Sequence, residues 1–164
     1  MNETIARRSP TTRRPFLHMP VPWVFLLAFL LGLGVQLLLP LRPPSSTLSG
    51  LAWFAGLVLF AGGVVIAGWG LVLFHRLKTT TTPGEAPNRL VTSGPYRFAR
   101  NPMYLGLVLA YLGEQGMLAL AWPLLFLVLT VGYLNWFVIP IEEDTLGAFG
   151  PAYQAYRARV RRWI

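Results

Sequence analysis

The chain has 164 residues, of which 54% are apolar and 12% are charged, whereas roughly 25% of the residues of a soluble domain are charged. It contains no cysteine and two histidines, which excludes disulfides, iron–sulfur clusters, thiolate zinc sites, a cysteine nucleophile and an imidazole-rich metal site. A net charge of +8 could indicate nucleic-acid binding. The apolar residues, however, come in long unbroken runs, which indicates an integral membrane protein.

Four apolar segments predict an all-α integral membrane protein with four transmembrane helices. A polar arm precedes the first segment and no small-residue cleavage site follows it, so we expect a membrane helix there and not a signal peptide. The second segment would form a helix of about 40 Å, which has to tilt or protrude from a hydrocarbon core of about 30 Å. We expect the cytoplasmic basic arm at 1–19 and a single membrane domain at 20–164, with helices at 21–41, 48–74, 103–120 and 123–140.

Small residues are frequent in the second apolar segment. In lipid, small residues let two helices approach closely, so helix packing is the simpler explanation for them. The alternative is a groove that holds a lipid chain. The glycines concerned are Gly56, Gly62, Gly63, Gly68 and Gly70.

The segment 75–102 is polar and basic, although apolar runs flank it on both sides. A loop that only joins two membrane helices has no need of turn-forming, cationic and aromatic residues in close succession. We therefore predict that this segment binds a ligand. The residues in question are Gly94, Pro95, Tyr96, Arg97, Arg100, Asn101 and Pro102.

The character of the chain changes again after the fourth apolar segment. Pro140 suits the first position of a helix, and three acidic residues, Glu142, Glu143 and Asp144, would fall in its first turn. Gly150 and Pro151 interrupt this region, and apolar residues then recur at spacings of three and four up to an arginine-rich end. We expect C-terminal helices at 141–162 that form an interfacial amphipathic pair on the membrane.

The basic residues predict how the chain is oriented. All lysines and arginines except Arg42 lie in the arm, in the segment 75–102 or in the C-terminal tail, which four spans would place on one side of the membrane. By the positive-inside rule this side is the cytoplasm. We expect a bacterial inner-membrane protein with both termini in the cytoplasm, whose charge attracts anionic membrane lipids and not nucleic acid.

The cytoplasmic ends of the third and fourth helices should meet, because the two helices form a tight hairpin. This would bring Arg100, Asn101 and Tyr104 close to Glu142 and Glu143. Opposed cationic and anionic groups suit a zwitterionic ligand that carries a carboxylate and an ammonium group, and the N–H groups that begin a helix favour an anion. The alternative is that these residues form an interface ion pair and cap a helix.

Four different motifs follow one another in the second half of the chain, from about residue 75 to residue 162. They are Gly94-Pro95-Tyr96-Arg97, Arg100-Asn101-Pro102-Met103-Tyr104-Leu105-Gly106, Glu142-Glu143-Asp144-Thr145-Leu146, and Phe149-Gly150 followed by Tyr153 and Tyr156. This half of the chain resembles the membrane methyltransferases of the isoprenylcysteine carboxyl methyltransferase and phospholipid methyltransferase superfamily. Asn101 departs from the family, which often has histidine there. An amide does not titrate near neutral pH, so we expect no general base at this position.

The resemblance implies S-adenosylmethionine as the cofactor and no metal. It implies a methyl acceptor that is lipophilic or small: an isoprenylcysteine carboxylate, a phospholipid amine or a thiol. Arg100 could instead act in catalysis, by orienting an anionic acceptor. The cofactor-binding residues that the resemblance implies are Val91, Gly94, Pro95, Tyr96, Arg100, Asn101, Pro102, Tyr104, Glu142 and Glu143.

Two further hypotheses remain open at this point. One is an NADPH-dependent membrane reductase of steroid-reductase-like architecture, in which Arg97, Arg157 and Arg159 could hold the 2′-phosphate. The other is a non-catalytic membrane adaptor whose basic arm and tail bind lipid.

Overall fold

The computed structural model describes residues 19–41, 49–78 and 89–164, and within these ranges every regular element is helical. The arm 1–19, apart from its last residue, therefore lies outside the described residues. The all-α prediction is confirmed for the described part of the chain. The main helices are α1 (Val21–Leu38), α2 (Ser49–Arg76), α3 (Pro102–Leu118), α4 (Trp122–Tyr133), α5 (Ile139–Leu146) and α6 (Pro151–Arg159).

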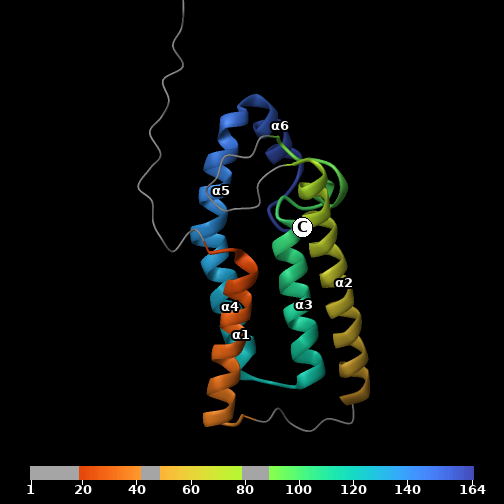
Figure 1. Ribbon diagram of the computed structural model, residues 1–164, viewed down its shortest axis with the longest axis vertical. Helices are drawn as coiled ribbons and strands as arrows, with labels where there is room; N and C mark the ends of the chain where they lie inside the picture. The colour runs from red at the N-terminus through yellow and green to blue at the C-terminus, as the bar shows by residue number, and fades with distance from the viewer. Residues whose placement is uncertain (1–18, 42–48, 79–88) are drawn as a thin grey trace, which may run out of the picture.

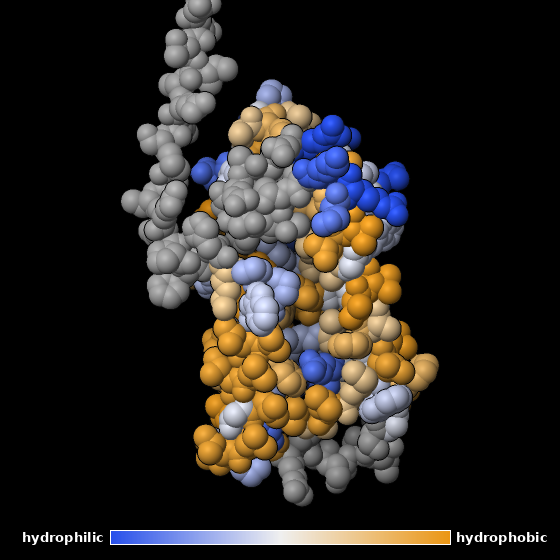
Figure 2. Space-filling view, viewed as in Figure 1, coloured by the Kyte–Doolittle hydropathy of each residue, from blue (hydrophilic) through white to orange (hydrophobic). Residues whose placement is uncertain are grey.

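Three helices of the described chain are long and apolar enough to cross a membrane, namely Val21–Leu38, Gly50–Arg76 and Trp122–Phe149. The remaining bundle helix, α3, has 17 residues and lies along α2. Figure 1 shows these helices running up and down side by side, with α5 and α6 at one end. In Figure 2, apolar side chains cover the flanks of the bundle, whereas hydrophilic ones gather at the end that carries α6.

The fourth predicted helix does not end at Pro140. A π-helical turn, Leu134–Val138, links α4 to α5, and the helix runs on through Pro140 to Leu146. Proline lacks an N–H group and crowds the preceding turn, and a π-turn is one of the local distortions that accommodate such a disturbance. The predicted C-terminal pair is present as α5 and α6, but α5 continues the bundle helix and only α6 is separate.

Two helix pairs make up the bundle: α3 packs chiefly against α2, and α4 packs chiefly against α1. The backbones of α2 and α3 nearly touch, because a methyl group at Gly56 would lie 2.6 Å from the carbonyl oxygen of Gly113, and one at Gly106 would lie 2.6 Å from the nitrogen of Ala67. Gly62 and Gly68 face open space. Part of the glycine pattern thus serves helix packing, as the simpler explanation held.

A core of side chains joins the two pairs. Phe25 of α1 and Leu127 of α4 are buried together with Tyr111 of α3. The Tyr111 hydroxyl donates a hydrogen bond of 2.9 Å to the carbonyl oxygen of Pro123, at the start of α4. This contact ties the far end of α3 to the returning helix, so the other ends of α3 and α5 are held on the same side of the molecule.

Candidate active site

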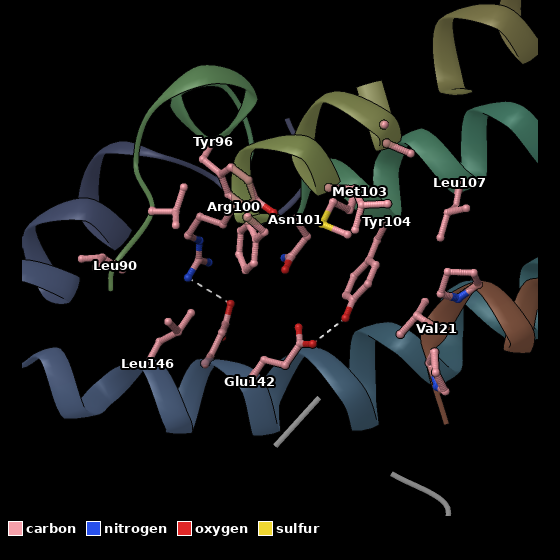
Figure 3. Close-up of a pocket in the computed structure, with 18 of the residues that line it drawn as sticks. Val21, Leu90, Tyr96, Arg100, Asn101, Met103, Tyr104, Leu107, Glu142 and Leu146 are labelled. Carbon is pink, nitrogen blue, oxygen red and sulfur yellow. Dashed lines mark hydrogen bonds and ion pairs between the residues drawn. The ribbon is translucent and has the colours of Figure 1, made fainter. Parts of the chain in front are cut away.

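A cavity of about 480 Å³ lies at the polar end of the bundle, where α2, α3 and α5 meet the loop 89–101 and α6. Figure 3 shows Arg100 and Glu142 pointing into this cavity from opposite walls. The wall consists of Pro20, Val21, Pro22, Gly63, Val64, Ala67, Gly68, Leu71, Phe74, Arg89, Leu90, Val91, Tyr96, Arg100, Asn101, Met103, Tyr104, Leu107, Ala110, Glu142, Glu143, Thr145, Leu146, Tyr153 and Tyr156.

Glu143 lies between two arginines. Its Oε1 is 2.9 Å from Nη1 of Arg100, and its Oε2 is 2.8 Å from Nη2 of Arg162. The side chains of Arg100 and Glu143 are only 12% and 11% exposed, so water screens their attraction weakly. The predicted proximity of Arg100 and the double glutamate is confirmed. The ion pair of the alternative interpretation is also present, so Glu143 is already neutralised by the protein.

Glu142 has a different partner. Its Oε1 accepts a short hydrogen bond from the hydroxyl of Tyr104, which stands one turn into α3 (Figure 3). Neither arginine forms an ion pair with Glu142 within the described chain. Of the two adjacent carboxyl groups, Glu142 is therefore the one that has no arginine partner within the described chain and that could pair with a cation in the cavity.

The loop before α3 forms the next part of the wall. Val91 and Tyr96 are buried, and the ring of Tyr96 packs on Phe74 of α2 with 5.3 Å between the centroids. The Tyr156 hydroxyl donates a 2.8 Å hydrogen bond to the carbonyl oxygen of Tyr96 and so fixes the loop to α6. Burial raises the pKa of Tyr156 to about 12, so this hydroxyl keeps its proton at neutral pH.

The C-terminal segment folds back onto the start of α3. The backbone N–H of Arg100 donates to the carbonyl oxygen of Arg161 at 2.9 Å. The backbone N–H and side-chain amide of Asn101 both donate to the carbonyl oxygen of Arg162, each at 3.2 Å. Figure 1 accordingly places the C-terminus beside the beginning of α3.

Most residues that the sequence suggested for cofactor binding line this one cavity: Val91, Tyr96, Arg100, Asn101, Tyr104, Glu142 and Glu143. Gly94, Pro95 and Pro102 do not line it. Gly94 has a φ of +60° and faces Trp69 and Leu73 of α2, while Pro95 and Pro102 are buried, the latter in the first turn of α3. These three residues shape the loop, because glycine reaches positive φ at no steric cost and proline presets the first turn of a helix.

Arg162 and Tyr153 were missed by reasoning from the sequence. Arg162 binds Glu143, and the Tyr153 hydroxyl accepts a hydrogen bond of 3.4 Å from Nη1 of Arg100. The arginine-rich tail looked like an orientation signal, and Tyr153 looked like part of an amphipathic pattern. Within the described residues, no group of three or more histidine, aspartate or glutamate side chains is placed to hold a metal ion.

The wall farther from Glu143 is apolar. Figure 3 shows Leu107 of α3 and Val21 at the start of α1 near one another at this end of the cavity. Val64, Ala67 and Gly68 of α2 also line the cavity. None of them carries a charge, and Gly68 leaves open space where a side chain would stand. The cavity thus combines a charged end with an apolar lobe beside the membrane-facing helices.

Two comparisons with known proteins match methyltransferases. The family model described as phospholipid methyltransferase matches residues 51–149. A methanethiol S-methyltransferase from Bradyrhizobium diazoefficiens is 35% identical over 78 residues, which cover 48% of this chain. The chain spans 27% of the length of that relative. No solved structure matches.

Proposed function

Because the chain belongs to the phospholipid methyltransferase family, we propose that it is an integral membrane methyltransferase that uses S-adenosylmethionine and methylates a small or lipophilic acceptor. The observation that carries the proposal is the cavity with Arg100 and Glu142 on opposite walls and an apolar lobe beside them. We further propose that α3 spans the membrane with the three longer helices, which gives four spans.

The residues of the charged end fit the amino-acid part of this cofactor. That part carries a carboxylate, which suits Arg100, and an ammonium group, which suits Glu142. The Nε atom of Arg100 is buried and has no hydrogen-bond partner within the described structure. A buried donor of this kind is costly unless it is paired, and a bound carboxylate would pair it. A volume of about 480 Å³ also lies within the range that holds one drug-sized ligand.

We propose the following roles for the residues that the sequence suggested for cofactor binding. Val91 and Tyr96 would line the adenosine, and Asn101 and Tyr104 would border the methionine part beside Glu142. Gly94, Pro95 and Pro102 fix the conformation of the loop and would affect cofactor binding only indirectly, because they do not line the cavity. The cofactor, when bound, supplies a methyl group that is already activated on a sulfonium, so the chain need only hold the acceptor in line with it and exclude water.

The apolar lobe is the proposed place of the acceptor. Its wall offers no cation for a carboxylate and no carboxylate for an amine, which favours an uncharged or weakly polar reacting group. The relative acts on methanethiol, according to its name. Small thiols are therefore the first acceptors to test, followed by phospholipid amines and isoprenylcysteine carboxylates, whose apolar chains could extend into the bilayer.

The proposal is tested by binding and by turnover. Calorimetry on the detergent-purified protein should give saturable binding of S-adenosylmethionine, with NADPH competing poorly. A labelled methyl donor should then transfer its methyl group to one member of a panel of thiols, phospholipids and prenylated cysteines. Absence of binding in two detergents would refute the proposal, and preferential binding of NADPH would favour the reductase.

Gly68 gives a specific test of the apolar lobe. The substitution Gly68→Leu would place an isobutyl group in the open space of the lobe, without a backbone clash. We expect kcat/KM for the acceptor to fall by at least about 10-fold, because a filled subsite excludes its ligand, with unchanged cofactor binding. Gly62→Leu on the same helix also faces open space but lies away from the cavity, and it should have wild-type activity. Equal activity of the two variants would place the acceptor elsewhere.

A further inference from the structure

We propose that Arg162 is a positioning residue for the cofactor carboxylate, and that it acts through Glu143 on Arg100. The inference rests on the proposed function, because it takes Arg100 as the partner of that carboxylate. Arg162 does not line the cavity in the described structure. Its influence on a ligand must therefore pass through the residues that it holds.

The first support is the geometry of the contact with Glu143. Nε and Nη2 of Arg162 donate to Oε1 and Oε2 of Glu143 at 3.1 and 2.8 Å. This two-point contact fixes the plane of the carboxylate as well as its position. Since Oε1 also forms an ion pair with Nη1 of Arg100 at 2.9 Å, we infer that the orientation of Glu143 sets the position of the Arg100 guanidinium.

The second support is that Arg162 is itself held in place. Its Nη1 donates to Oδ1 of Asn135 at 3.1 Å, and Nε1 of Trp163 donates to the same oxygen at 3.4 Å. Asn135 lies in the π-helical turn between α4 and α5, a kind of irregularity that often occurs at functional sites. The backbone of Arg161 and Arg162 also accepts hydrogen bonds from the backbone N–H groups of Arg100 and Asn101. Arg162 thus links the π-turn, α5 and the start of α3.

The third support is charge. One arginine and one glutamate would form a neutral pair, which attracts an anion weakly. Two arginines around one carboxylate leave a net positive charge in a largely buried place, where it acts more strongly than in water. Glu142 bonds to the neutral Tyr104 hydroxyl and pairs with neither arginine, so it weakens this positive charge only from a distance. Arg162 therefore lets Arg100 attract a second carboxylate although Glu143 already binds it.

The test compares two ligands on the same variants of the full chain. Arg162→Ala should weaken binding of S-adenosylmethionine by about 10-fold, since a hydrogen bond to a charged group is weakened. It should leave the affinity for 5′-methylthioadenosine unchanged, because that molecule lacks the amino-acid carboxylate. Arg159→Ala is the matched control, since it removes the same charge from an exposed arginine of the tail. It should bind both ligands as the wild type does.

A double-mutant cycle with Glu143→Gln separates positioning from mere stability. If Arg162 acts through Glu143, then Arg162→Ala should have little further effect on binding once Glu143 is replaced. Arg162→Lys keeps the charge but loses the two-point contact, so its affinity for S-adenosylmethionine should lie between those of Arg162→Ala and the wild type. If Arg162→Ala does not fold, Arg162→Lys takes its place in the cycle. Additive effects, or an equal loss of affinity for both ligands, would overturn the proposal. If the wild type binds neither ligand, the proposed function fails first.

Discussion

Two adjacent glutamates of α5 have different surroundings and should respond differently to the same substitution. Within the described chain, Glu142 bonds to the Tyr104 hydroxyl and to neither arginine, whereas Glu143 is bound by two arginines. Glu142→Gln keeps the shape of the side chain and removes its charge. We expect binding of S-adenosylmethionine to weaken by about 10-fold or more, because a charged hydrogen bond is replaced by a neutral one. The melting temperature should change little.

Glu143→Gln should instead lower both stability and affinity. Arg100 and Arg162 would lose their common counter-charge, and removing one partner of a largely buried pair is among the more costly single substitutions. Because Arg162 is 29% exposed, we expect about 2 kcal/mol, somewhat below the range for a fully buried pair. Thermal unfolding in detergent measures this. Asp144→Asn, an exposed acid on the same helix, is the control, and a comparable loss there would contradict the assignment.

A third expectation at this scale concerns the Tyr156 hydroxyl. It donates to the carbonyl oxygen of Tyr96 inside the protein. Tyr156→Phe would leave that carbonyl buried without a partner, at a cost of about 1–3 kcal/mol. Tyr153→Phe should cost less, because the Tyr153 hydroxyl accepts only a long contact of 3.4 Å from Arg100. Melting temperatures of the two variants test the order, and a reversed order would refute it.

At the residue scale, the sequence predicted contacts that depend on helix ends and missed one that depends on the path of the tail. Arg100 and Tyr104 begin one helix of a hairpin and the glutamates lie in the other, so their meeting follows from connectivity. Arg162 reaches Glu143 only because the segment after α6 folds back along the start of α3. No periodicity in the sequence predicts that this segment folds back. Arginines near the end of a membrane helix are also expected from the positive-inside rule, so Arg162 gave no sign of a contact with Glu143.

At the scale of elements, the contact of α2 with α3 depends on glycine at particular positions. Gly56→Ala would put a methyl group 2.6 Å from the carbonyl oxygen of Gly113, and backbone atoms can move away only if the helices separate. We expect a loss of about 1–3 kcal/mol, as for other overpacked sites. Gly62→Ala, six residues along the same helix, meets open space and should unfold like the wild type. Thermal unfolding in detergent gives both values.

The elements themselves were predicted with one informative error. Apolar runs and their polar boundaries gave the bundle helices to within a turn, and Gly150 with φ +57° separates α6 as predicted. The error was a break at Pro140, where the structure continues the helix after a π-turn. A π-turn has no sequence signature comparable to that of proline. The π-turn matters for the cavity, because the uninterrupted helix places Glu142 and Glu143 in its lining.

At the scale of the whole molecule, the described lysines and arginines lie at the end of the bundle that holds the cavity, as the hydrophilic surface in Figure 2 illustrates. By the positive-inside rule we expect the cavity and the C-terminus on the cytoplasmic side, where the proposed cofactor would reach the cavity. The opposite end carries Leu41, after α1. This orientation follows from charge alone, so it can be tested independently of any activity.

The natural chain has no cysteine, so single substitutions report on sidedness without a background. Leu41, Phe98 and Ile164 are 50%, 76% and 79% exposed, and cysteine at each should react with a maleimide once the reagent reaches it. In intact cells, a membrane-impermeant maleimide should label Leu41→Cys only, and Phe98→Cys and Ile164→Cys should react after permeabilisation. Labelling of Phe98→Cys and Leu41→Cys from the same side would mean that α2 fails to cross, because only α2 lies between them. Labelling of Phe98→Cys and Ile164→Cys from opposite sides would mean that α3 or the helix formed by α4 and α5 fails to cross. Labelling of Phe98→Cys and Ile164→Cys, but not of Leu41→Cys, in intact cells would show the opposite orientation. The cavity would then lie outside the cytoplasm, which would contradict the proposed access of the cofactor.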